Sequence, residues 1–525
     1  MFENLSNIEN EELQRLSASR VVRVGSPPKE IHVVDRRILQ SFDIADNVIV
    51  HPTVIIGELY FKNCIFMNKV RIGEYRNAGG VIFENCLFEK EVILFATANI
   101  SLLGHIEFKG KTEITISNDK VFENVIVRSE ILLNCNSSKL ISRIRNINID
   151  IPFQQCSINI IATSAMVQLQ NVYGSDLSVR LIQGKSVSVN NSNFSNCIIG
   201  GQDESYVYFE NTVLGSIDLS VNSNKNNIVE FFDCTIEKLE VGNAEFKKFN
   251  VNASKIATLL FSGLIEKDIY ITISKVEVGN LTFENFFNNG ILVFHGVSIY
   301  NSGKLRMISS TFGKTDFILC NFEEATFEFE NSKISDVFLA ETDFSQVIKG
   351  NKDLRYYRQM QLAFGQISTA FQKQGDTVRA LEYQSREIEA HYRNLKYLNK
   401  GLRKFSFTKL SLGLNKLSND FGRSWQKAAF FSVIIGIFFF YGVVICSDQY
   451  SIGFPITFNK DLLQGFFKFM NPLRFFETES LFKAGEGKPS PTLNIGSYFF
   501  DYLGRIFVAY GFYQTIQAFR KFGRK

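Results

Sequence analysis

Apolar residues recur at two short periods between residues 50 and 348. The segment FKNCIF at 61–66 is followed 22 residues later by FENCLF at 83–88. A finer period of five runs through one stretch, where the apolar positions are Ile236, Val241, Phe246, Val251, Ile256 and Phe261. Such repeats are typical of solenoids, because no single coil can bury its apolar face alone. The pattern predicts stacked coils of about 20 to 22 residues.

Small residues accompany the five-residue period. Cys234 stands two positions before Ile236, and Cys320 stands two positions before Phe322. This pattern resembles the pentapeptide-repeat proteins. The resemblance implies a mainly β fold, a right-handed parallel β-helix over residues 49–348 behind an N-terminal cap at 1–48. Stacked coils would bury the following side chains: Cys64, Phe66, Cys86, Phe88, Cys234, Ile236, Phe246, Cys320, Phe322 and Phe327.

Helical patterns precede and follow the repeats. The segment NIENEELQRLSAS at 7–19 predicts a short amphipathic helix within the cap. After the repeats, apolar residues at three- and four-residue spacing predict a helical hairpin over 349–402, with Leu354, Tyr357 and Met360 on its first helix. We expect this hairpin to close the end of the β-helix, since a solenoid end otherwise exposes backbone.

The last part of the chain predicts two membrane spans. Residues 428–446 contain no charge over 19 positions, enough to cross the hydrocarbon core. A second apolar stretch, 495–519, includes Asp501 and Arg505, which are spaced to pair on adjacent helical turns. Between them, 447–494 is expected to be an extracytoplasmic or re-entrant loop, with a break at Pro472.

Basic residues set the predicted orientation. They concentrate in the juxtamembrane segment 403–427 and in the tail 520–525. By the positive-inside rule both termini are then cytoplasmic, which predicts a two-span protein of the bacterial inner membrane with a cytosolic β-helix. Eight cysteines without a CxxC pair agree with a reducing compartment.

One face of the second span is small or polar over about six turns. It consists of Ser497, Asp501, Gly504, Val508, Gly511, Thr515 and Ala518, with Arg505 beside it. Bulky residues such as Phe500 and Phe507 are expected to face lipid. Because one other span offers the small face little to pack against, the pattern predicts a homo-oligomer in which this face packs between protomers or lines a pore.

Composition excludes several kinds of function. The formal net charge is +4, and no basic stripe precedes residue 400, so nucleic acid is not expected as a partner. The five histidines are isolated and no catalytic motif occurs, so we expect neither an enzyme nor a metal or other cofactor. A β-helix enzyme acting on polysaccharides remains a distant alternative.

Two functional hypotheses follow. The first is a sensor or effector whose two-span region oligomerises and conducts ions, a layout similar to two-span cation channels but without a T-x-G-Y-G filter. Some abortive-infection defence effectors share this architecture. The second is a passive scaffold, tethered to membrane lipid, that binds a cytosolic protein along the β-helix.

Overall fold

The computed structural model has two compact units, Met1–Ser345 and Gln346–Lys525. It describes residues 353–398, 407–447, 460–473, 481 and 494–522, most of 58–116 and 157–348, and short segments between 6 and 56 and between 121 and 145. The first unit is a parallel β-solenoid and the second is helical, which confirms the predicted mainly β solenoid followed by helices.

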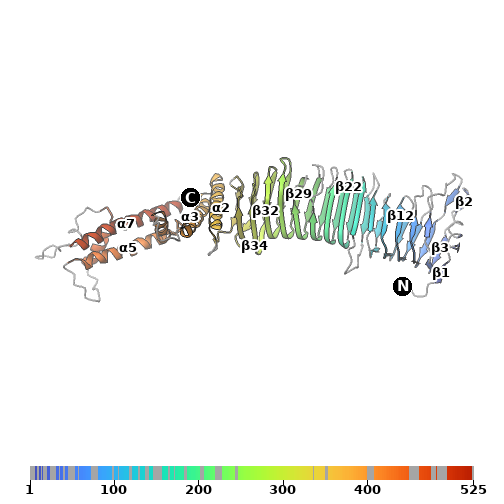
Figure 1. The fold of residues 1–525 in the computed structure, drawn as a ribbon, viewed down its shortest axis with the longest axis horizontal. Coiled ribbons are helices and arrows are strands. Elements are labelled where there is room, and N and C mark those ends of the chain that lie inside the picture. The colour runs from blue at the N-terminus through green and yellow to red at the C-terminus, as the bar shows by residue number, and fades with distance from the viewer. Residues whose placement is uncertain are drawn as a thin grey trace. The chain divides into compact units, whose positions relative to one another are not determined.

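The solenoid consists of long parallel sheets whose strands come from successive coils (Figure 1). The largest has 16 described strands: β5 (Phe42–Ile44), β9 (Val70–Ile72), β12 (Val92–Ala96), β15 (Thr112–Ile116), β18 (Ile131–Cys135), β20 (Ser157–Thr163), β22 (Tyr173–Ile182), β24 (Asn193–Gly201), β26 (Val213–Asp218), β28 (Thr235–Val241), β30 (Lys255–Ile265), β32 (Glu277–Asn288), β34 (Ser298–Ile308), β36 (Asn321–Phe322), β37 (Thr326–Glu330) and β39 (Asp343–Phe344). The second has 11 described strands: β16 (Val121–Glu123), β19 (Ile141–Arg145), β21 (Met166–Gln170), β23 (Ser186–Asn190), β25 (Tyr206–Glu210), β27 (Asn227–Phe232), β29 (Phe246–Asn252), β31 (Tyr270–Ser274), β33 (Ile291–His295), β35 (Thr315–Ile318) and β38 (Phe338–Ala340).

Smaller sheets lie in the N-terminal coils. A six-stranded parallel sheet contains β1 (Ser6–Ile8), β4 (Arg36–Ile38), β8 (Ile65–Phe66), β11 (Leu87–Phe88), β14 (Ile106–Phe108) and β17 (Val125–Val127). A four-stranded parallel sheet contains β3 (Ile31–Val34), β7 (Leu59–Lys62), β10 (Val81–Glu84) and β13 (Ile100–Leu103), and β2 (Val21–Arg23) pairs antiparallel with β6 (Val54–Ile56). The helix predicted over 7–19 is wrong at its start, because Asn7 and Ile8 belong to β1 and pair with β4.

The two copies of the six-residue motif are stacked coils. Phe61 pairs with Phe83, and their rings stack with centroids 5.3 Å apart. Phe66 pairs with Phe88, with centroids 4.7 Å apart. Like side chains therefore lie on like side chains along the interior, as the repeat predicts.

FKNCIF and FENCLF share the motif F-[EK]-N, and its asparagine turns the chain at a corner of the coil. Asn63 and Asn85 adopt φ values of 52° and 51°, in the left-handed region that Asn tolerates better than most residues. Further along, Asn211 is also left-handed, and its amide donates a hydrogen bond of 2.7 Å to Asn191 one coil away. The repeated Asn thus supplies the backbone conformation that ends one strand and starts the next.

The cysteine that follows this corner is a hydrogen-bond donor. Cys86 Sγ donates to the backbone oxygens of Glu84 and Phe61, at 3.4 and 3.5 Å. In other coils Thr212 makes the same pair of bonds, to the Glu210 and Val189 oxygens at 2.8 and 3.3 Å. Cys86 and Thr212 therefore share one role, which the sequence pattern did not indicate, since it predicted only that these cysteines are small and buried.

The predicted interior residues are buried wherever the structure describes their side chains. These are Cys64, Phe66, Cys86, Phe88, Cys234, Ile236, Cys320, Phe322 and Phe327. The side chain of Phe246, on β29, lies outside the described part. Burial raises the pKa of the Cys234 and Cys320 thiols to about 11, so both stay protonated at neutral pH.

The described residues of the second unit form a helical hairpin followed by four further helices. They are α2 (Leu354–Lys373), α3 (Thr377–Leu398), α4 (Phe407–Asn419), α5 (Trp425–Ile445), α6 (Lys460–Phe469) and α7 (Ile495–Phe522). α2 and α3 turn back on each other at Gly375, whose φ is 83°, and the ring of Tyr383 packs against Phe364 and Phe371 of α2. Among the described residues, α5 is the one helix long and apolar enough to cross a membrane.

Candidate functional site

The small face predicted on the last helix is its buried face. Ser497, Asp501, Gly504, Val508, Gly511 and Ala518 are all buried on α7. Thr515 is only partly buried, and Gln514 is buried one position earlier. The pattern of small and polar residues therefore identified which side of α7 packs against protein.

The partner of that face is α5 of the same chain. Ser497 Oγ donates to the Val443 backbone oxygen at 3.3 Å near one end of the helix pair. Toward the other end, a Cβ added at Gly511 would overlap the Ser432 side chain. Trp425 and Phe519 meet edge to face with centroids 6.1 Å apart. The two helices thus form an antiparallel hairpin with a close seam.

The expectation that a single neighbouring span could not cover this face was therefore wrong. α5 offers small residues of its own: Ser432 meets Gly511, and Gly442 lies against the ring of Phe500. Phe500 and Phe507, expected to face lipid, instead pack against Phe439. Because these contacts lie within one chain, the seam does not require a second protomer.

The surface that α5 and α7 present outward is apolar. On α5 it consists of Phe430, Val433, Ile434, Ile437, Phe438, Tyr441 and Ile445, and on α7 of Tyr498, Phe499, Tyr502, Ile506, Phe512, Tyr513, Ile516 and Phe519. Polar groups lie inside the hairpin instead, including Ser432, Ser497, Asp501 and Gln514. This arrangement is the reverse of a water-soluble helix pair.

A charged pair lies within the seam. Arg505 donates to Asp501 Oδ2 through Nη2 at 3.0 Å and through Nε at 3.1 Å. The Asp501 side chain is 1% exposed and that of Arg505 is 11% exposed. Such a pair is costly to place among apolar side chains unless both charges are satisfied. The predicted pairing of these two residues is present within α7.

The short helix α6 packs against the middle of the hairpin. Phe469, in its last turn, meets Gly504 of α7 and packs on Phe440 of α5, with ring centroids 5.6 Å apart. Just after α6, the sulfur of Met470 lies where a Cβ on Gly436 would be. Gly436 lies nine residues before the end of α5, which corresponds to about 13 Å along the helix. α6 therefore reaches well inside the length of α5.

A second charged cluster lies where the chain enters α5. Glu389 of α3 accepts hydrogen bonds from Arg393 at 2.8 Å and from Arg423 at 2.7 Å, and Arg386 lies 3.2 Å away. Burial favours the protonated carboxyl, but these arginine hydrogen bonds outweigh it, and the pKa of Glu389 is lowered. The cluster ties the α2–α3 hairpin to the turn before α5.

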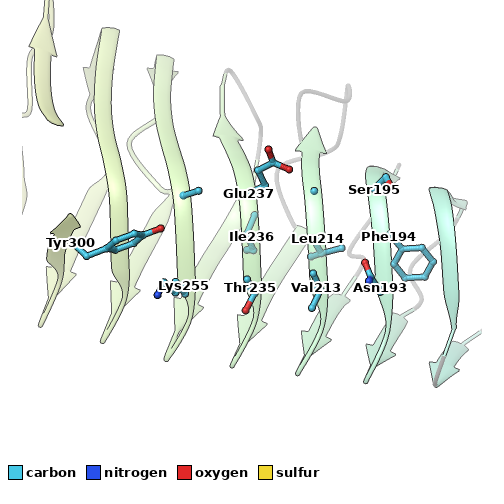
Figure 2. Close-up of a pocket in the computed structure, with 12 residues that line it drawn as sticks. Asn193, Phe194, Ser195, Val213, Leu214, Thr235, Ile236, Glu237, Lys255 and Tyr300 are labelled. Carbon is cyan, nitrogen blue, oxygen red and sulfur yellow. The ribbon is translucent and has the colours of Figure 1, made fainter. Parts of the chain in front are cut away.

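The solenoid carries a shallow groove on its outer surface. It has a volume of 420 Å³ and crosses several coils. Figure 2 shows Asn193, Val213, Thr235 and Lys255 in a row on successive strands, following the strand register. Tyr300 stands at one end, where the Lys255 ammonium lies 4.7 Å from its ring centre. The groove offers mixed polar and apolar contacts with little net charge.

Comparison with protein-family models, curated proteins and solved structures gives no match. The likeness to pentapeptide-repeat proteins thus stays a resemblance of pattern, while the parallel solenoid itself is present. Within the residues that the structure describes, His, Cys, Asp and Glu form no group suited to a metal ion.

Proposed function

We propose that the protein is a membrane-anchored β-solenoid whose helices α5 and α7 cross the bilayer as a two-span hairpin. The observation that carries this proposal is the apolar outer surface of both α5 and α7, with the polar residues enclosed between them. Leaving a large apolar side chain in water costs about 1.5–3 kcal/mol, so more than a dozen of them favour lipid as the surroundings.

The same geometry supports two spans, although α7 carries charge. Asp501 and Arg505 pair through Asp501 Oδ2 on the buried side of α7, so neither charge is presented to the surface that α7 turns outward. Intramembrane charges are tolerated when they pair and face protein. α6 serves as the re-entrant element, because its last turn contacts Gly504 and Phe440 inside the hairpin.

In this proposal the α2–α3 hairpin and the solenoid stand on the basic, cytoplasmic side of the inner membrane. The solenoid offers the groove between Asn193 and Tyr300 to a cytosolic protein partner. The seam between α5 and α7 is complete without a second protomer. The contacts therefore favour a membrane-tethered scaffold over an ion-conducting oligomer.

Ion conduction by a homo-oligomer is the second candidate. It is favoured by the buried Asp501–Arg505 pair and by the helix α6 that ends within the length of α5. In such a pore, α6 would contribute to the lining, and the Asp501–Arg505 pair, on the face of α7 that meets α6 at Gly504, would set the field that ions encounter. Single-channel recording on purified protein in planar bilayers tests this candidate, with the empty bilayer as the control.

Membrane insertion is tested with single labels on the outer surface of each helix. Ile437→Cys and Ile506→Cys carry an environment-sensitive fluorophore in full-length protein reconstituted into vesicles, and the exposed Lys304→Cys on the solenoid is the matched control. Nitroxides on the lipid acyl chains should quench the labels at 437 and 506 and spare the one at 304. Absence of quenching at 506, with quenching at 437, would leave a single span.

A further inference from the structure

The helix α4 carries an exposed apolar stripe. Phe407, Leu410 and Leu417 occupy one face at spacings of three and seven residues. Phe407 is 79% exposed and Leu417 is 70% exposed, and Leu414, on the same stripe, is partly exposed. The stripe is thus a continuous apolar surface along the whole length of α4.

Other faces of α4 hold it in place. The Asn419 amide donates to Gln514 of α7, and Ser418 is buried beside it. The Lys416 ammonium lies 5.6 Å from the ring centre of Tyr392, on α3. These contacts fix the direction in which the stripe points.

The position of α4 relative to the hairpin is set by a sharp turn. Asp420, Phe421 and Gly422 have φ values of 53°, 60° and 84°, so α4 and α5 cannot be one continuous helix. Asn419 Oδ1 accepts from the Gly422 backbone N–H at 2.8 Å, and Ser424 caps the first turn of α5. α4 therefore lies beside the end of α5 that carries Trp425, whose ring meets Phe519 of α7.

The sequence that leads into α5 is rich in basic residues. Between residues 403 and 427 the sequence contains six basic residues and one acidic residue: Arg403, Lys404, Lys409, Lys416, Arg423, Lys427 and Asp420. A basic amphipathic segment next to a membrane span is attracted to the negative surface of a leaflet that contains anionic lipid. The same segment presents its apolar stripe for insertion at the boundary between headgroups and acyl chains.

We infer that α4 is an interfacial helix that binds the surface of the bilayer, with its stripe in the upper acyl region and its basic residues among anionic phospholipid headgroups. The inference rests on the proposed insertion of α5 and α7, since it extends that lipid-facing surface around the turn at Asn419. A consequence is that the Glu389 cluster, which joins α3 to Arg423, transmits the orientation of α4 to the α2–α3 hairpin.

The test uses full-length protein in vesicles of phosphatidylcholine, with or without phosphatidylserine. A fluorophore is placed at Leu417→Cys on the stripe and, as the matched control, at Thr408→Cys, which is exposed on another side of α4. We expect the label at 417 to shift to the blue and to be quenched by nitroxides near the headgroups but not deep in the chains. Phosphatidylserine should enlarge both effects, and the label at 408 should show neither.

Charge dependence is tested with Lys409→Gln and Lys416→Gln together. The double variant should lose the phosphatidylserine-dependent part of the shift at 417 and keep the part seen in phosphatidylcholine alone. Equal signals from the labels at 408 and 417 would overturn the inference. Energy transfer between labels at 417 on two copies, without quenching by the nitroxide lipids, would also overturn it, because the stripe would then pack on a second copy and not on lipid. The label at Ile437 in the same vesicles separates the failures: if it too is unquenched, the proposed insertion fails; if only 417 is unquenched, the interfacial role of α4 fails.

Discussion

Arg505 Nη2 lies 3.0 Å from Asp501 Oδ2 on the face of α7 that Ser497 and Gly504 also share. Ser497 contacts α5, and Gly504 contacts α5 and α6, so the pair belongs to a surface enclosed by the chain itself. The two charges neutralise each other one helical turn apart, through Asp501 Oδ2. The ion pair is therefore compatible with a membrane hairpin that is complete in a single protomer.

Removing one partner of this pair should open the hairpin. Asp501→Asn leaves the Arg505 charge buried without its carboxylate, and breaking a buried pair costs about 3–5 kcal/mol. We expect a lower unfolding midpoint in detergent, measured by circular dichroism. The double variant Asp501→Asn with Arg505→Gln should recover most of the loss, because no uncompensated charge remains. An unchanged unfolding midpoint for Asp501→Asn alone would mean that water reaches the ion pair.

The charge-swapped variant, Asp501→Arg with Arg505→Asp, separates the anchor from the pore. In an anchor the two charges only neutralise each other, so the swap should produce no ion current, although the larger Arg at the buried position 501 should loosen the seam. In a pore the swap should alter ion selectivity in reconstituted bilayers, because it reverses the local field. Selectivity that changes with the swap would favour conduction over the scaffold function.

Bulk in the seam should separate α5 from α7. Gly511→Leu would overlap Ser432, and no rotamer of Leu removes the clash of its Cβ. We expect a loss of about 1–3 kcal/mol, typical of overpacking, seen as weaker crosslinking between cysteines placed on the two helices. The matched control is Ala509→Leu, on the exposed side of α7, which should have little effect. If both variants lower crosslinking equally, the seam is not where the structure places it.

The solenoid corner should accept a hydroxyl in place of a thiol. Cys86→Ser keeps the donor to Glu84 and Phe61, as Thr212 does in its own coil, so we expect a change within about 1 kcal/mol. Cys86→Ala loses the donor and should cost more, and Cys86→Asp should prevent folding because it buries a charge. Urea unfolding, followed by tyrosine fluorescence, measures the relative stabilities of the three variants. Rapid labelling of native Cys86 by a thiol reagent would contradict its burial.

The Glu389 cluster should make the helical unit sensitive to acid. The pKa of Glu389 is lowered in the folded state, so its contribution is present above its unfolded pKa of about 4.3 and is lost as pH falls through the folded value. Glu389→Gln should therefore destabilise the helical unit at pH 7 by about 1.5–3 kcal/mol, the range for a hydrogen bond to a charged group. The difference from the wild type should shrink below about pH 4. A difference independent of pH would assign the effect to packing.

Much of the fold follows from patterns that are local in the sequence. Phe61 and Phe83 stack because coils of similar length bring equivalent positions into register, which the repeat already indicates. The corner role of Asn63 and Asn85 was visible as the recurring F-[EK]-N, although the left-handed backbone that explains it was not inferred. The shared role of Cys86 and Thr212 was missed, and the recurring N-[CST]-x-[FIL] was the signal that could have shown it.

The residues that cover the packed face of α7 could be identified only from the tertiary structure. Spacing on α7 identified Gly504 and Gly511 as members of one packed face, since helical periodicity depends on the chain alone. It could not say that Ser432 and Phe469 meet that face, because both come from segments whose path is set by other contacts. The sequence analysis predicted an oligomer because no covering residues in the same chain could be identified. In the structure, α5 and α6 cover the face within one protomer. The sequence by itself determined which residues of α7 lie together, and the fold determined that their neighbours belong to the same chain.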